Sequence, residues 1–188
     1  MRTALLLIDI QNDYFPGGAM ELVAADRASS HAAMLLARFR ECAWPVFHVQ
    51  HLSTRPTATF FRPNTPGVDI HPSVLPAAGE TVISKSFPNG FRETSLLEAL
   101  RAAEVSKLVI AGMMTHMCVD TTVRAAADLG FACTVAHDAC ATRDLAFGGQ
   151  SVPASAVQAA YMAALNGSFG SVLSAAEVGA SLPLPGEA

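Results

Sequence analysis

The stretch from Lys107 to Gly130, KLVIAGMMTHMCVDTTVRAAADLG, constrains the fold more than any other part of the chain. Its apolar run 108–111 is typical of a strand that is buried on both faces, and Gly112 interrupts this run. Beyond the break, apolar residues recur at helical spacing as far as Gly130, a residue type that often ends a helix. The stretch therefore predicts a strand, a tight turn and a helix, which is one repeating unit of a parallel α/β sheet.

Apolar runs alternate with helical patterns along the rest of the chain. This alternation predicts an α/β fold in which parallel strands are joined by right-handed crossovers. At 188 residues the chain is long enough for one well-packed domain, so we expect a single domain over residues 1–188. Ser95 and Glu98 have the spacing of a capping box at the start of a helix. The predicted strands are 3–8, 46–50, 81–84, 108–111, 131–136 and 169–173, the predicted helices are 26–43, 95 onward, 119–130, 153–165 and 175–178, and 140–152 is predicted to be a loop.

Three reactive side chains, Asp9, Lys85 and Cys118, follow predicted strands at their C-terminal ends. Because these ends of parallel strands lie at one edge of a sheet, the three side chains can converge in one cleft. The helix start and the Lys85 ammonium would both stabilise the Cys118 thiolate, which is the nucleophilic form. Asp9 can accept the thiol proton and return it to a leaving amine. The alternatives are that Asp9 caps a turn and that Cys118 is a small apolar residue at a helix start.

The composition argues against several classes of partner. Charged residues make up only 15% of the chain and the net charge is −4 with no basic run, which argues against nucleic acid and anionic membranes. No stretch is long enough to span a membrane, no secretory signal is present and the four cysteines form no CxxC pair, so we expect a cytoplasmic protein with free thiols. A hydrophobic fraction of 51% predicts apolar surface covered by subunit contacts, in a homo-oligomer such as a dimer or tetramer.

The least regular region is 51–79, which contains five prolines and the pair Phe60–Phe61. A loop of this length in a compact domain is usually functional, so it is expected to be a lid, a binding loop or a subunit contact arm. Binding pockets are usually lined by aromatic surface, and the candidates for such a wall are Tyr14, Phe61 and Phe91, each of which is equally compatible with a place in the core. His116 either faces the pocket or is a turn residue that bonds to the backbone.

Three segments, MRTALLLIDIQNDYFPGG, VISKSFPNGF and VIAGMMTHMCVDTTVRAAADLG, resemble the isochorismatase-like family of cysteine hydrolases, which includes nicotinamidases and other small-amide hydrolases. The resemblance implies a three-layer α/β/α sandwich around a parallel sheet of about six strands. It also implies that Asp9, Lys85 and Cys118 are the catalytic residues, and that the Met113–Met114 peptide bond is cis. The backbone N–H groups of Met114 and Cys118 would then form the oxyanion hole.

The expected function is therefore hydrolysis of a small amide-type C–N bond through a thioester on Cys118. The partner implied is a small-molecule amide substrate. One alternative is an isochorismate-type hydrolase that cleaves a vinyl ether, and another is a non-catalytic small-molecule binding module of the same fold. A thiol redox protein is a third, although no resolving cysteine lies near Cys118 in the sequence.

We expect no cofactor and no metal. The nicotinamidases of the resembling family bind a metal through an Asp-x-His pair just after the second strand, together with further histidines. Here Val49 stands at the aspartate position and cannot bind a metal, although His51 remains and His48 and His71 lie nearby. The loss of this pair makes nicotinamide a weaker candidate for the substrate, because the metal holds the pyridine nitrogen in those enzymes.

Overall fold

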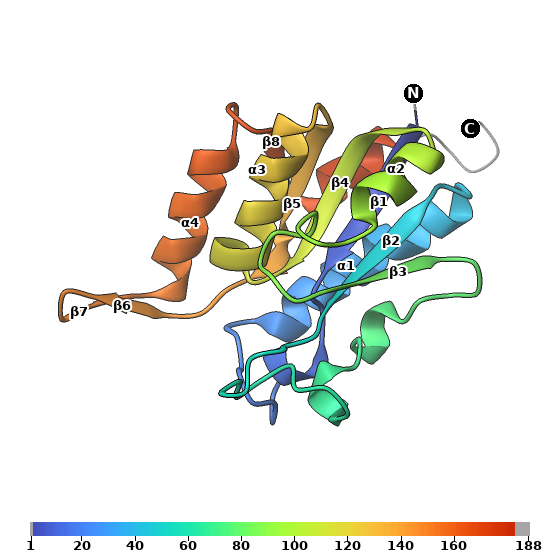
Figure 1. Ribbon diagram of the computed structural model, residues 1–188. Helices are drawn as coiled ribbons and strands as arrows, with labels where there is room; N and C mark the ends of the chain where they lie inside the picture. The colour runs from blue at the N-terminus through green and yellow to red at the C-terminus, as the bar shows by residue number, and fades with distance from the viewer. Residues whose placement is uncertain (1, 183–188) are drawn as a thin grey trace.

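The computed structural model describes residues 2–182, and its centre is a six-stranded sheet in the order β3-β2-β1-β4-β5-β8 (Figure 1). Every neighbouring pair in this sheet is parallel, as the alternation of strands and helices predicts. Residue 1 and residues 183–188, which the predicted single domain includes, lie outside the described residues. The strands are β1 (Arg2–Ile8), β2 (Val46–His51), β3 (Thr81–Lys85), β4 (Val105–Met113), β5 (Ala132–Ala141) and β8 (Ser171–Leu173).

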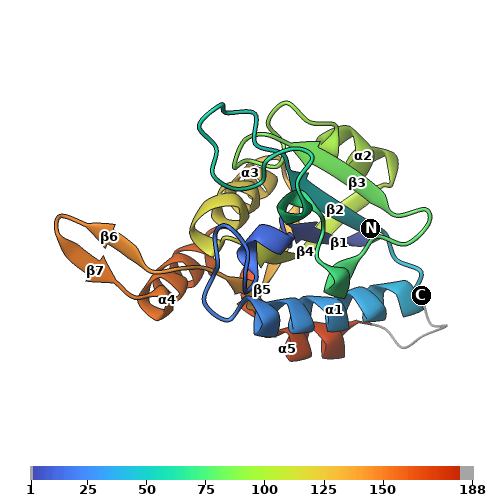
Figure 2. The same cartoon turned by 90° about the horizontal axis from the view of Figure 1, so that it is seen from below.

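Helices cover both faces of the sheet, which gives the three-layer sandwich (Figure 2). Alternate residues of β4 show how the two cores divide: Val109 and Ala111 pack into the core beneath α1 and α5, whereas Leu108 and Ile110 pack against α2, α3 and α4. None of the helices within residues 2–182 has the length and apolar character needed to cross a membrane. The helices are α1 (Ala25–Glu41), α2 (Leu96–Ala102), α3 (Asp120–Asp128), α4 (Ala154–Leu165) and α5 (Ala175–Ser181).

Gly112 allows the two central strands, β1 and β4, to lie close together. Its φ of 141° lies in a region that side chains disfavour, and a Cβ at this position would collide with the carbonyl oxygen of Ile8. The break that the sequence shows after the run 108–111 is therefore a close approach of two backbones rather than the end of the strand. At the other end of this unit, Gly130 adopts a φ of 90° just beyond α3, as expected of a residue that ends a helix.

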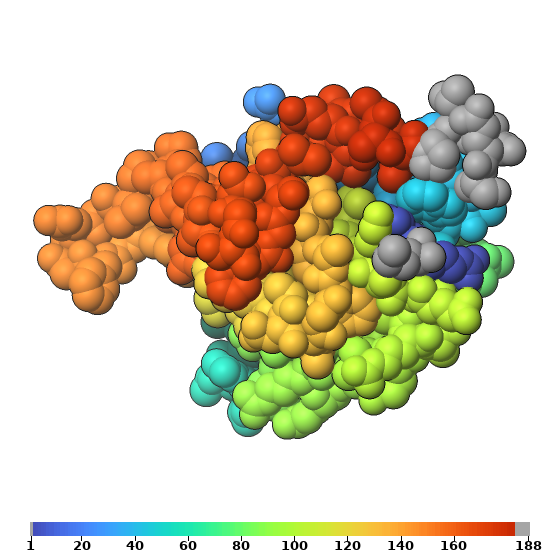
Figure 3. Space-filling view, turned by 90° about the horizontal axis from the view of Figure 1, so that it is seen from above, coloured from blue at the N-terminus to red at the C-terminus, as the bar shows by residue number. Residues whose placement is uncertain are grey.

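The region 140–152 differs from the predicted loop. A register shift between Ile110 and Gly112 lets β5 pair with β4 as far as Ala141, so this strand runs beyond its predicted end. The chain then forms an antiparallel hairpin of β6 (Leu145–Phe147) and β7 (Gln150–Val152), which projects from the body of the molecule (Figures 1 and 3). Phe147 on this hairpin is 87% exposed.

The capping box predicted at Ser95 is absent, although Ser95 does precede α2. The Ser95 backbone has φ −87° and ψ 11°, which is not the extended conformation that a capping side chain needs, and its hydroxyl makes no capping bond. Thr94 Oγ1 instead accepts a bond from the Leu96 N–H at 3.3 Å. The structure has a capping box at α5, where Ser174 and Glu177 bond reciprocally.

Candidate active site

Three strands of the sheet bring Asp9, Lys85 and Cys118 to one edge. Asp9 follows the last residue of β1 and has a φ of 51°, while its N–H bonds to the Val49 carbonyl of β2 at 2.9 Å. Lys85 is the last residue of β3. Cys118 lies in η4, the π-helical turn Thr115–Val119 that connects β4 to α3. Residues far apart in sequence therefore meet, because the carboxyl ends of parallel strands share an edge.

Lys85 bridges the other two side chains. Its Nζ lies 2.6 Å from Asp9 Oδ2 and donates to Cys118 Sγ at 3.2 Å. All three residues are buried, with exposed fractions of 0%, 2% and 5% for Asp9, Lys85 and Cys118. Burial lowers the pKa of Lys85, but the negative charge of Asp9 and the hydrogen bonds to Asp9 and Cys118 outweigh it and leave the pKa above its usual value. Lys85 therefore stays an ammonium ion in contact with a carboxylate.

The state of the Cys118 thiol differs from the sequence-based expectation of a stabilised thiolate. Burial raises the pKa of Cys118, the charge of Asp9 raises it further, and the opposing effect of Lys85 is too small to reverse the shift. The π-helical turn also places Cys118 ahead of α3, which begins at Asp120, so Cys118 is not at the first turn of that helix. The resting residue is a neutral thiol near the Asp9 carboxylate.

His51, at the end of β2, completes the contacts of Lys85. Its Nδ1 lies 2.9 Å from Lys85 Nζ and accepts a hydrogen bond from it. Burial, together with the Lys85 charge, lowers the pKa of His51 to about 4, so the ring is neutral near pH 7. The buried Gln11 fixes the His51 backbone, because its Oε1 accepts from the His51 N–H at 2.8 Å and its Nε2 donates to the His51 carbonyl at 3.0 Å.

Among residues 2–182, the one group that could hold a metal ion is Asp9, His51 and Cys118, whose ligand atoms lie within 4.8 Å of one another. The Lys85 ammonium contacts all three, so a cation placed among them would meet a positive charge. The other candidate histidines have separate partners. His48 bonds to Glu80 at 2.9 Å, and the ring of His71 stacks on Phe15 at 3.6 Å.

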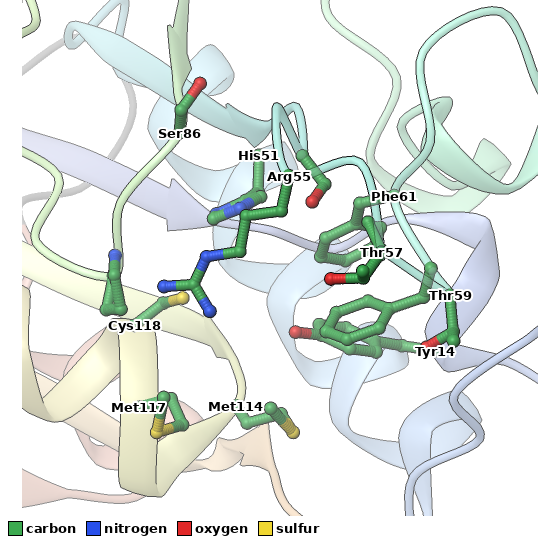
Figure 4. Close-up of a pocket in the computed structure, with 14 residues that line it drawn as sticks. Tyr14, His51, Arg55, Thr57, Thr59, Phe61, Ser86, Met114, Met117 and Cys118 are labelled. Atoms are coloured by element: carbon green, nitrogen blue, oxygen red, sulfur yellow. The ribbon is translucent and has the colours of Figure 1, made fainter.

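A pocket of about 290 Å³ opens over Cys118 (Figure 4). Tyr14 and Phe61, two of the aromatic candidates, line it, and their ring centroids are 4.6 Å apart. The segment 53–61 supplies much of the remaining wall, as expected of a binding loop. The other residues that line the pocket are His51, Ser53, Arg55, Thr57, Ala58, Thr59, Phe60, Ser86, Pro88, Met114 and Met117.

Phe91 and His116, the other two pocket candidates, do not line this pocket. The Gly90 N–H bonds to Thr122 Oγ1 at 2.9 Å, and next to this bond the half-buried Phe91 packs against the core, where its ring stacks on Phe131 with centroids 6.2 Å apart. His116 Nδ1 bonds to Thr142 Oγ1 at 2.6 Å. Side chains that are two residues apart in a helical turn point in different directions. His116 therefore lies away from the pocket that Cys118 lines.

The Met113–Met114 peptide bond is cis, at the position that the resemblance implies. Met114 and Cys118, the residues expected to supply the oxyanion hole, both line the pocket. Between them the turn is closed by the Met114 carbonyl, which accepts from the N–H groups of Met117 at 3.0 Å and Val119 at 3.2 Å.

Two residues of the site were not among the sequence candidates. Gln11 is fully buried in the segment after β1, and Arg55 is an exposed residue of the loop 53–61. Gln11 lies within the first family-like segment, so the motif carries a signal for it, but nothing in the sequence distinguishes Arg55 from Arg62, the other arginine of the irregular region 51–79.

Comparison with known proteins gives consistent matches. The sequence profile of the Isochorismatase domain matches residues 3–177. An uncharacterised isochorismatase family protein of Bacillus subtilis, YddQ, is 52% identical over 92% of this chain and 96% of its own length. The crystal structure of an isochorismatase hydrolase from Oleispira antarctica, 51% identical, superposes with a TM-score of 0.93 over 96% of this chain and 97% of that one. The nicotinamidase of Escherichia coli is 29% identical over 73% of this chain and 82% of its own length.

Proposed function

Because the chain belongs to the isochorismatase family of hydrolases, we propose that it hydrolyses a small amide-type C–N bond through a thioester on Cys118. The observation that carries this proposal is the Lys85 ammonium, which bridges the Asp9 carboxylate and the Cys118 thiol beneath a small pocket. A relative named nicotinamidase supports amide chemistry in the family. The proposed catalytic residues are Asp9, Lys85 and Cys118.

The first step begins from the neutral thiol. The Asp9 carboxylate lies close enough to the Cys118 thiol to raise its pKa, so it can take the Cys118 proton. Cys118 Sγ then bonds to the amide carbonyl carbon, and the carbonyl π electrons move to oxygen. We propose that the N–H groups of Met114 and Cys118 stabilise this oxyanion, each by about 3 kcal/mol, as donors in other oxyanion holes do.

In the second step the oxyanion collapses and the C–N bond breaks. Asp9 gives its proton to the departing nitrogen, so ammonia or an amine leaves and the acyl group remains on Cys118 as a thioester. Water that Asp9 deprotonates then attacks the thioester carbonyl, and its proton passes through Asp9 to the Cys118 sulfur as the carboxylic acid leaves. Lys85 opposes the negative charge of Asp9 throughout, and the neutral His51 ring holds Lys85 in place.

Two other substrate classes fit less well. Nicotinamide is disfavoured because Val49, at the position of the metal-binding aspartate in the resembling enzymes, is an apolar residue with 2% exposure. Vinyl ether cleavage of the isochorismate type is less favoured, because the thiol that lines the pocket contacts an ammonium paired with a carboxylate, an arrangement suited to attack on an amide carbonyl.

The test is ammonia release from a panel of small amides, ureas and carbamates. Cys118→Ala is expected to reduce turnover by at least about 10⁴-fold, because removal of a nucleophile disables the whole catalytic unit. Cys42→Ala, a buried cysteine at the end of α1 and outside the pocket, is the matched control and should retain activity. Mass spectrometry of the quenched enzyme should detect the acyl group on Cys118. Near wild-type turnover by Cys118→Ala would contradict the proposal.

A further inference from the structure

We propose that the substrate is an amide that also carries a carboxylate, and that Arg55 binds this carboxylate. This inference rests on the proposed amide hydrolysis and specifies its substrate class. It assigns a role to a loop residue that the catalytic steps do not use.

The Arg55 guanidinium is a charge without a protein partner. Its side chain points across the pocket toward Cys118 (Figure 4). The residues that line the pocket include no aspartate or glutamate, and within residues 2–182 the guanidinium has no ion pair or hydrogen bond. Its charge reaches His51, the neighbour of Lys85, since it contributes to the lowered pKa of His51. A ligand that enters this pocket therefore meets an unpaired positive charge on the wall of the pocket that Cys118 also lines.

The loop that carries Arg55 has a fixed neck. The Ser53 N–H bonds to the Phe61 carbonyl at 2.9 Å and closes the loop 53–61 at its base. On one side of the neck, the Leu52 N–H bonds to the Lys85 carbonyl at 2.8 Å. On the other, the Phe61 N–H bonds to Oδ2 of the buried Asp13 at 2.6 Å. The backbone of the catalytic lysine thus anchors the loop that presents Arg55.

The chemistry of the walls fits a short acid with an amide at its other end. A guanidinium can donate two parallel hydrogen bonds to a carboxylate, and the hydroxyls of Thr57 and Thr59 in the same loop are further donors. Tyr14 and Phe61 provide apolar surface for the carbon chain between the two groups. A volume of about 290 Å³ limits the ligand to a small molecule. Half-amides of short dicarboxylic acids have this combination of groups.

The experiment compares the half-amides of malonic, succinic and glutaric acid with the corresponding diamides, using ammonia release by the wild-type enzyme, Arg55→Gln and Arg55→Lys. At least one half-amide should be preferred to its diamide. Arg55→Gln should lower kcat/KM for that half-amide by about 10- to 100-fold, mainly through KM, and for the diamide by much less. Arg55→Lys should fall between the two, because lysine keeps the charge but loses the two-pronged geometry. Added salt should weaken the preference.

Arg62→Gln is the matched control, since it removes the same charge from an exposed residue that adjoins the loop but does not line the pocket. It should leave the ratio of half-amide to diamide unchanged. Equal use of half-amides and diamides, or an equal loss on both in Arg55→Gln, would overturn the carboxylate inference while leaving amide hydrolysis intact.

A binding measurement separates the two proposals. Calorimetry with Cys118→Ala, which cannot form the thioester, should detect binding of the preferred half-amide, and the added change Arg55→Gln should abolish it. Such Arg55-dependent binding without any ammonia release by the wild-type enzyme would support the carboxylate site and contradict the proposed hydrolysis. Absence of binding to all three half-amides would overturn the inference.

Discussion

The two sides of the pocket are built in different ways. Asp9, Lys85 and Cys118, which we call the strand-end triad, lie at or just after the ends of three paired strands and are buried. The loop 53–61 on the other side is bonded to the strands at its neck, and residues 54–57 at its tip are exposed. Pairing along the whole sheet fixes the first side, whereas a few local bonds fix the second. This difference suggests that the sheet supplies the reaction and the loop supplies the choice of substrate.

The strongest test of this division is Asp9→Asn, which keeps the shape of the triad and removes one charge. We expect a loss in kcat of about 10²- to 10⁴-fold, because the residue that moves the proton is gone. The same change should lower the pKa of the Cys118 thiol, since the Asp9 carboxylate raises it. Ammonia release and the pH dependence of Cys118 alkylation measure the two effects.

The opposite signs of these two effects make the result informative. A variant that is less active but alkylated at lower pH shows that Asp9 acts as the base rather than merely supporting the fold. An unchanged alkylation profile together with full activity would remove Asp9 from the mechanism.

A second prediction concerns how firmly the sheet holds the triad. Gly112→Ala should lower the free energy of unfolding by about 3 kcal/mol or more, because the added methyl group meets the Ile8 carbonyl next to Asp9. Gly79→Ala is the control, since its φ of 89° is also unfavourable to a side chain but the space around it is open. Gly79→Ala should lower the free energy of unfolding by only about 1 kcal/mol. Denaturant unfolding measures both, and equal costs would mean that the close approach of β1 and β4 is unimportant.

The smallest expected effect links the loop to the triad. The His51 ring should titrate at about pH 4 in NMR spectra, and Arg55→Gln should move its pKa upward, because a nearby positive charge disfavours the imidazolium. In the unfolded chain this ring takes up a proton at about pH 6.5, so the lowered pKa destabilises the fold progressively as the pH falls from there toward 4. If the pKa of His51 were the same in the wild-type protein and in Arg55→Gln, the loop and the triad would be electrostatically independent.

The sequence predicted the strand-end triad because its signals are local. An apolar run followed at once by Asp9 or Lys85 identifies a strand end, and the parallel fold then brings such ends together. The β6–β7 hairpin and the end of β5 were missed because they depend on the register shift at Gly112, which is a long-range feature. Helix boundaries agree within a few residues, as the α1 range Ala25–Glu41 illustrates.

The pocket walls were predicted less well. Tyr14 and Phe61 line the pocket, whereas Phe91 packs against the core beside the turn in which the Gly90 N–H bonds to Thr122. Loops have no periodic sequence pattern that predicts which side a residue faces. For this reason the sequence could not single out Arg55. Aromatic residues next to a predicted site are thus weaker evidence than reactive residues at strand ends.

The closed neck of loop 53–61 bears on how such a protein diversifies. Because the Ser53–Phe61 bond holds the two ends of the loop together, insertions, deletions or replacements between them need not disturb the strands below. A descendant can acquire a new preference by changes in this short surface segment while it inherits the reaction centre intact. A segment that can change and a frame that need not change with it are thus already separated by the hydrogen bonds of a single chain.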